Sequence, residues 1–456
     1  MRWAIVLTFT ALLGASAAPA AEPPSVADLV RQLETGAPGE RVIAAERLGD
    51  LGPAAADGVP ALARAAHTAN RLQKSNENSA DTKRAARFLY EAAIDALGRI
   101  GPKAAPALVE LMPVEKDDPF GEAHVSLGSL GPAAAPVVPA LAKLLADDNQ
   151  DFRVRVAGVL ERIGPAAEPA VPQLIELFHN PKNKEDNRWA SGPLPPPPRV
   201  AAVRALLRIG PKAAPALADK ILPALAEELK TGEHPPGGDP AEVLSVLGET
   251  GAPLVPAVVA AIHKANPALN REEAGRALLG MGKTGRKAFG EALAAAAPKI
   301  RRELVASLKW HLWGEHFPTY YRFDAPALDI TPFVPALVTA FKDPDPEQRL
   351  AAAEVLCDRP HPVPAGARNA VFALFRDPAV KKFLHEKGEL LFPYPRLGAF
   401  GEPGVRALVA LLDSDTVAVR RFALDQLPGS RTWAADALPK LRKLSTDRNT
   451  ELALSA

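Results

Sequence analysis

The sequence predicts an all-α fold, a right-handed α-α superhelix (solenoid) of about ten antiparallel helix pairs. Three observations predict it: a short phrase ending in glycine and proline recurs along the chain, an apolar stretch follows most copies, and apolar residues recur at spacings of three and four. One face of each helix must therefore be covered by a neighbouring helix.

The first 21 residues have the order of a secretory signal peptide. Arg2 precedes an apolar run from Trp3 to Leu13, and small residues follow from Gly14 to Ala21. This run and the later apolar stretches are shorter than the roughly 20 residues that span a bilayer, which argues against an uncleaved anchor. We expect cleavage after Ala20 or Ala21, a periplasmic or extracellular location, and no membrane insertion after signal cleavage.

The recurring phrase marks the end of the first helix of each pair. A closing glycine can take the left-handed conformation that ends a helix, and proline cannot continue that helix. A further proline in most copies suits the first turn of the second helix, where no amide hydrogen is needed. The closing glycines are Gly52, Gly101, Gly131, Gly164 and Gly210 in clear copies and Gly251, Gly282 and Gly401 in weaker ones, and the further prolines are Pro106, Pro136, Pro169 and Pro215.

Acidic residues precede the next first helix at 147–151, 343–345 and 413–415. Their side chains can accept hydrogen bonds from the first amides of that helix and favour its positive end.

At these residues the chain resembles the HEAT-repeat superfamily, specifically the short HEAT-like repeats named after phycobilisome lyases. The resemblance covers residues 38–297 well and 332–446 more loosely. It implies stacked antiparallel helix pairs that form a curved superhelix.

Interruptions of the repeats suggest the domain organisation. We expect a repeat array over 22–309, with loop insertions near 73–82, 180–199 and 231–240, then an aromatic-rich insertion over 310–331 and further repeats over 332–456. Consecutive prolines at 195–198 favour a polyproline II segment, either a stiff exposed spacer or a docking segment for a partner.

The insertion at 310–331 holds the candidate binding residues. It carries six aromatic side chains within 310–324, whereas the whole chain is 5% aromatic. Tryptophan and tyrosine often dominate binding surfaces, although such a cluster can equally fill space between two sub-stacks. The candidate residues are Trp310, Trp313, His316, Tyr320 and Tyr321.

No catalytic residue, metal ligand or cofactor is expected. The superfamily includes a di-iron hydroxylase with repeated His-Glu pairs, but only His385-Glu386 has that order here. No bilin-handling motif is visible. The segment Gly280-Met281-Gly282-Lys283-Thr284 lacks the first glycine of a phosphate loop and is interpreted as an inter-helix turn. Cys357, the single cysteine, is interpreted as a core residue.

The predicted function is an exported non-enzymatic scaffold that binds a protein or peptide in the bacterial envelope. Lys and Arg number 54 against 53 Asp and Glu, so no net field favours nucleic acid. Two alternatives stay open: an accessory ligand- or glycan-binding domain of an envelope enzyme system, and a divergent lyase or metal-dependent enzyme.

Overall fold

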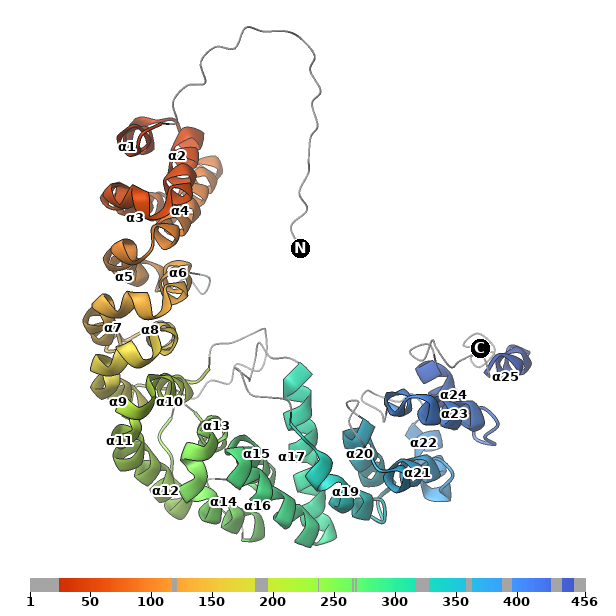
Figure 1. The fold of residues 1–456 in the computed structure, drawn as a ribbon. Helices are drawn as coiled ribbons and strands as arrows, with labels where there is room; N and C mark the ends of the chain where they lie inside the picture. Colours follow the sequence, from red (N-terminus) through yellow and green to blue (C-terminus); the bar gives the residue numbers. More distant parts are fainter. Residues whose placement is uncertain are drawn as a thin grey trace. The chain divides into compact units, whose positions relative to one another are not determined.

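The structure is a computed structural model that describes residues 24–116, 121–184, 196–236, 238–264, 266, 269–316, 328–357, 363–387, 396–427 and 437–446, with only the backbone at 313–316 and 387. Every regular element in these ranges is helical, so the all-α prediction is confirmed there (Figure 1). The predicted signal peptide, residues 1–21, lies outside the described ranges.

The chain forms two compact units, Met1–Leu130 and Gly131–Ala456. In the first unit, α2, α4 and α6 lie side by side in one layer, and α1, α3 and α5 form a second layer beside it (Figure 1). Its elements are α1 (Val26–Thr35), α2 (Pro38–Asp50), η1 (Gly52–Gly58), α3 (Val59–Lys74), α4 (Ala80–Ile100), η2 (Pro102–Ala104), α5 (Ala105–Leu111), η3 (Met112–Glu115) and α6 (Ala123–Ser129).

The second unit repeats this two-layer arrangement. One layer runs α8, α10, α13, α15, α17, α20, α22 and α24, and the helices that follow each of these form the other. Its elements are η4 (Gly131–Val137), α7 (Val138–Leu144), α8 (Gln150–Ile163), η5 (Gly164–Ala170), α9 (Val171–His179), α10 (Pro198–Ile209), η6 (Gly210–Lys212), α11 (Ala214–Ala216), η7 (Leu217–Ile221), α12 (Leu222–Thr231), α13 (Pro240–Val246), η8 (Gly248–Leu254), α14 (Val255–His263), α15 (Arg271–Gly280), α16 (Gly282–Ala295), α17 (Pro298–His316), η9 (Thr331–Phe333), α19 (Val334–Ala340), α20 (Pro346–Cys357), α21 (Ala365–Leu374), α22 (Pro378–Lys387), η10 (Leu397–Phe400), α23 (Glu402–Leu411), α24 (Val417–Gln426) and α25 (Leu438–Leu444).

Closing glycines have positive φ at all the predicted positions except Gly251. Gly101, with φ 92° and ψ −146°, shows that the backbone leaves the left-handed helical region that we predicted and enters a region that is nearly exclusive to glycine. In the sixth copy Gly248 takes this role, because α13 already ends at Val246. Gly251 lies within η8 instead.

The prolines that follow the turns only partly match the prediction. Pro106 and Pro215 lie in the first turn of α5 and α11, as predicted. Pro136 and Pro169 lie inside η4 and η5 instead, because these 3-10 turns extend further and delay the next helix. The predicted polyproline run also ends early, since Pro198 is the first residue of α10, a position that tolerates proline.

Arginines near the start of α8 and α24 donate hydrogen bonds to backbone carbonyls at the end of the preceding helix pair. The side chain of Arg153 is fully buried, and its Nη1 donates to the carbonyls of Asp147 at 2.7 Å and Asp148 at 3.1 Å. Arg420 donates in the same way to the carbonyl of Ser414 at 2.8 Å. These bonds satisfy carbonyl groups that would otherwise lack a partner where a helix ends.

Asn149 and Asp345 cap α8 and α20. The Asn149 side chain accepts from the amide of Phe152 at 3.0 Å, and Asp345 accepts from the amide of Glu347 at 2.9 Å. The prediction of acidic caps is thus confirmed at 343–345, an amide replaces the carboxylate before α8, and before α24 the cap residue is Thr416, whose side chain makes no cap hydrogen bond.

Candidate functional site

The predicted aromatic residues begin on a long helix. Trp310, Trp313 and His316 belong to α17, which passes through the predicted boundary between residues 309 and 310. The side chains of Trp313 and His316, and the whole of Tyr320 and Tyr321, lie outside what the structure describes. The domain boundaries and these four candidate residues therefore stay predictions.

Trp310 is partly buried against the neighbouring helix α15. The guanidinium carbon of Arg276 lies over the indole ring, 4.5 Å from its centroid. Such a contact is favourable because the ring face carries partial negative charge. The buried Nε of Arg276 has no hydrogen-bond partner among the described residues.

Two carboxylates lie beside this stack, one on α13 and one on α15, and both helices adjoin in the same layer (Figure 1). The pKa of Glu242 is raised from 4.5 to about 7, mainly by burial and also by the charge of Asp239, while the charge of Arg276 opposes the rise. Burial also raises the pKa of Glu273, whose carboxylate accepts from the amide of Asn270 at 2.8 Å. We call Asp239, Glu242, Glu273, Arg276 and Trp310 the acidic-aromatic surface.

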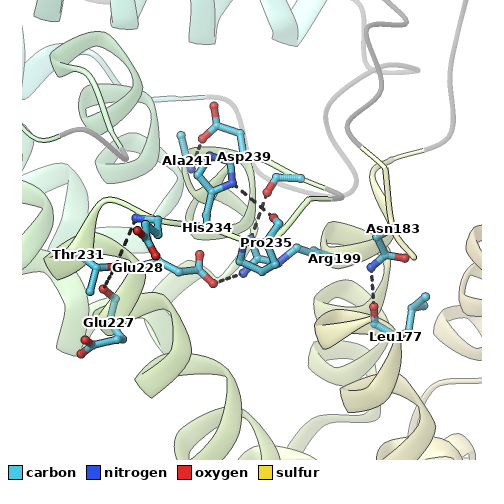
Figure 2. Close-up of polar contacts among 12 residues, drawn as sticks. Leu177, Asn183, Arg199, Glu227, Glu228, Thr231, His234, Pro235, Asp239 and Ala241 are labelled. Atoms are coloured by element: carbon cyan, nitrogen blue, oxygen red, sulfur yellow. Dashed lines mark hydrogen bonds and ion pairs between the residues drawn. The ribbon is translucent and has the colours of Figure 1, made fainter. Parts of the chain in front are cut away.

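Residues from the predicted insertions at 180–199 and 231–240 lie close to one another next to this surface (Figure 2). Arg199, at the end of the first insertion, is fully buried and donates to Glu228 at 2.5 Å and to the carbonyl of Gly238 at 3.2 Å. Its guanidinium carbon also lies 4.3 Å from the ring centroid of Phe178. Arg199, in the predicted insertion at 180–199, is therefore joined to α12 by a buried ion pair and to the predicted insertion at 231–240 by the hydrogen bond to Gly238.

Electrostatic effects connect this junction to the acidic-aromatic surface. Burial lowers the pKa of Arg199 and raises that of Glu228, and each charge opposes the shift of the other. The charge of His234 lowers the pKa of Glu228, and the charge of Asp239 raises the pKa of Arg199. Asp239 also caps α13 by accepting from the amide of Ala241 at 2.7 Å (Figure 2).

Replacing Glu242 with glutamine should make stability less dependent on pH. The folded protein binds this proton more tightly than the unfolded chain, so wild-type stability falls as pH rises from about 4.5 through about 7. We expect Glu242→Gln to stabilise the second unit by about 1–2 kcal/mol above that range and to give no gain below it. Urea unfolding across pH measures this, and an equal gain at every pH would contradict the titration of Glu242.

The segment that resembles a phosphate loop is an inter-helix turn, as predicted. Gly282 begins α16 directly after α15, and the Glu249 carboxylate accepts from the amides of Lys283 and Thr284. Its second oxygen accepts from the Thr284 hydroxyl at 2.8 Å. Hydrogen bonds from Thr284, first from its side chain, lower the pKa of Glu249. A carboxylate of this chain therefore occupies the amides that a phosphate would need.

Within the described ranges, no three or more His, Cys, Asp and Glu side chains gather in a way that could hold a metal ion. His385 and Glu386 lie on α22, and Cys357 is buried at the end of α20, in agreement with its predicted core role.

No single described helix has the length and apolar composition to cross a membrane. One bent pair of segments, Ala123–Ser129 and Gly131–Leu144, reaches the required length and composition only when taken together.

Most residues of the acidic-aromatic surface were not predicted from the sequence. Asp239 and Asn270 are cap residues, and Glu242 and Glu273 each follow a cap by three residues. This repeated capping-box pattern could have indicated that the two glutamates lie close together, because it places each of them in the first turn of its helix, and α13 and α15 are neighbours. Arg276 gave no signal, since its contact with Trp310 depends on how α15 and α17 pack.

No protein-family model matches the chain, and no curated protein matches it. Among solved structures, the chain is similar to a mutant of Kap121p (13% identity, TM-score 0.42, covering 93% of this chain and 47% of that chain). It is also similar to a chain from a structure of Kap95p binding to RanGDP (12%, 0.39, 95% and 66%) and to an engineered protein (18%, 0.27, 94% and 96%). The chain thus spans less than two thirds of the first two.

Proposed function

We propose that this chain is a non-enzymatic helical-repeat scaffold that binds a protein or peptide partner in the bacterial envelope after export. The described helices stack in two layers, and most of their buried polar groups join neighbouring repeats. The pattern of residues 1–21 supports export, and the repeats resemble the HEAT-like kind.

The acidic-aromatic surface carries this proposal. Burial raises the pKa values of Glu242 and Glu273, and the charge of Arg276 offsets this rise only in part. Trp310 adds broad apolar area next to them. A lysine or arginine side chain of a partner would neutralise the carboxylates and contact the indole, so the surface favours a basic peptide segment.

Binding of basic peptides to the full chain tests this function. We expect peptides with Lys and Arg to bind and matched peptides with Gln at those positions to bind at least about tenfold more weakly. Trp310→Ala should weaken binding of the basic peptides by at least about tenfold, because the aromatic contact is lost. Isothermal titration calorimetry in buffers of different ionisation enthalpy should also detect proton release near neutral pH.

Leu438→Ala is the matched control, because Leu438 is an exposed apolar residue on α25, far along the chain. It should bind like the wild type. Equal binding of the Gln peptides, or full binding by Trp310→Ala, would contradict this role of the surface.

Export has its own test. N-terminal sequencing of the protein recovered from the periplasm or medium should begin at Ala21 or Glu22. Recovery from the cytoplasm with Met1 retained would contradict export and leave peptide binding unaffected.

A further inference from the structure

Exposed apolar residues in the first unit gather on the helix layer formed by α2 and α4. Phe88 on α4 is 54% exposed and Ile43 on α2 is 46% exposed, unusually high values for large apolar side chains. Exposed apolar residues that lie together commonly mark a surface that another protein covers.

The solvent side of α4 carries a regular stripe of residues around Phe88. Their spacings of three and four keep them on one face, opposite the buried residues of the helix. All are exposed except Glu91, which is partly buried. In order, the stripe is Asp81, Arg84, Phe88, Glu91, Asp95 and Arg99.

The charges of this stripe are complementary to those of an identical stripe that runs antiparallel to it. If two copies of α4 lie antiparallel about an axis near residue 90, Asp81 faces Arg99 and Arg84 faces Asp95 of the second copy. Every facing charged pair is then attractive, and the same pairs recur on the other side of the axis. A parallel arrangement would place each charge opposite its own kind, which is unfavourable.

The apolar residues fall at the centre of this arrangement. Gly49 of α2 lies against Ala96 of α4, and Asp50 forms an ion pair with Arg99, so the two helices run side by side with their ends level. Ile43 is therefore level with the residues of α4 near position 90. Phe88 and Ile43 of both copies would come together at the axis, with Asp81, Arg84, Asp95 and Arg99 at the rim. Glu91, which forms an ion pair with Arg87 at 2.6 Å, would face Phe88 of the second copy.

The charges are paired within one chain at present, at exposed positions. Arg84 lies 3.6 Å from Asp81, and Arg99 forms ion pairs with Asp50 and, at 3.4 Å, with Asp95. Such exposed pairs contribute little stability, so exchanging them for pairs with a second copy costs little.

We propose that the stripe of α4, together with Ile43 of α2, is the interface of an antiparallel homodimer of this chain. The second copy is the occupant that the charge pattern favours, because an identical stripe supplies each opposite charge at the required spacing. The interface lies within the first unit and is independent of the acidic-aromatic surface.

Sedimentation equilibrium of the full chain tests the dimer. The wild type should show the mass of two chains at low salt and a weaker association at high salt, because rim charges are screened. Phe88→Glu and Arg84→Asp should each weaken the association at least about tenfold, since one removes the apolar centre and the other places like charges opposite each other twice.

The decisive variant combines Arg84→Asp with Asp95→Arg. In the antiparallel dimer it restores both attractive pairs, so its dissociation constant should return to within about threefold of the wild-type value. Leu438→Glu, an equally exposed apolar position in the second unit, should leave the dissociation constant unchanged.

Three outcomes would overturn the proposal: a wild-type chain that is monomeric throughout, a double variant as weak as Arg84→Asp alone, or a Leu438→Glu variant as weak as Phe88→Glu. A monomer would also indicate that a different protein covers this face. Circular dichroism of each variant confirms that the exposed substitutions leave the helices intact.

Discussion

Glu228→Ala should destabilise the second unit by about 3–5 kcal/mol, the largest effect we expect from a single substitution. Among the described residues, the change leaves the fully buried guanidinium of Arg199 with the Gly238 carbonyl, the Phe178 ring and the charge of Asp239. Arginine keeps its charge at every accessible pH, so it cannot escape the cost of burial by losing a proton. The loss of stability should therefore persist across the pH range.

Arg199→Ala should behave differently. It leaves the Glu228 carboxylate buried beside His234, but a carboxyl can take up a proton. Burial already raises the pKa of Glu228, and removal of Arg199 removes the main opposing charge. The folded state then binds this proton more tightly than the unfolded chain, so the destabilisation should shrink as the pH falls.

The double variant Arg199→Met with Glu228→Leu is the control. Apolar residues of similar volume often replace a buried ion pair with little loss, so we expect a stability close to that of the wild type. Urea unfolding measures the totals, and hydrogen exchange of the α10 and α12 amides assigns the loss to this place, because repeat arrays need not unfold in one step. A loss of stability in the double variant as large as that in Glu228→Ala would show that the loss comes from the altered shape of the side chains and not from an unpaired buried charge.

The helix pairs could be predicted because the information is local. Glycine and proline at the turns and apolar residues at spacings of three and four act within one pair, so the sequence of each repeat indicates its own fold.

The ends of the elements were less predictable. Pro136 and Pro169 lie in longer 3-10 turns than expected, because a 3-10 turn and an α turn differ little in free energy.

The site was only partly predictable because its contacts join residues one or more repeats apart. Trp310 was found by composition, but the guanidinium above it comes from Arg276, 34 residues earlier. The pair of Arg199 and Glu228 depends on how α10 packs against α12, which neither helix indicates by itself. Contacts of this kind follow from the packing of successive pairs, and one sequence carries little trace of them.

Gly101→Val should destabilise the first unit by about 2–3 kcal/mol through the backbone alone. An added Cβ at Gly101 meets no atom within 4 Å, so crowding of the Cβ does not contribute. The cost arises because φ is 92° and ψ is −146°, a conformation that β-branched residues strongly disfavour. Val must either hold this strained conformation or shift the turn that connects α4 to α5.

Gly39→Val is the matched control, because Gly39 lies in the same unit, within α2, and its added Cβ also meets nothing within 4 Å. Its φ is not in the left-handed range, so the same substitution should change stability by less than about 0.5 kcal/mol. Chemical unfolding followed by circular dichroism compares the two variants. If both lose the same stability, the helix end at Gly101 does not depend on positive φ, and the Gly-Pro phrase must end the first helices through its proline instead.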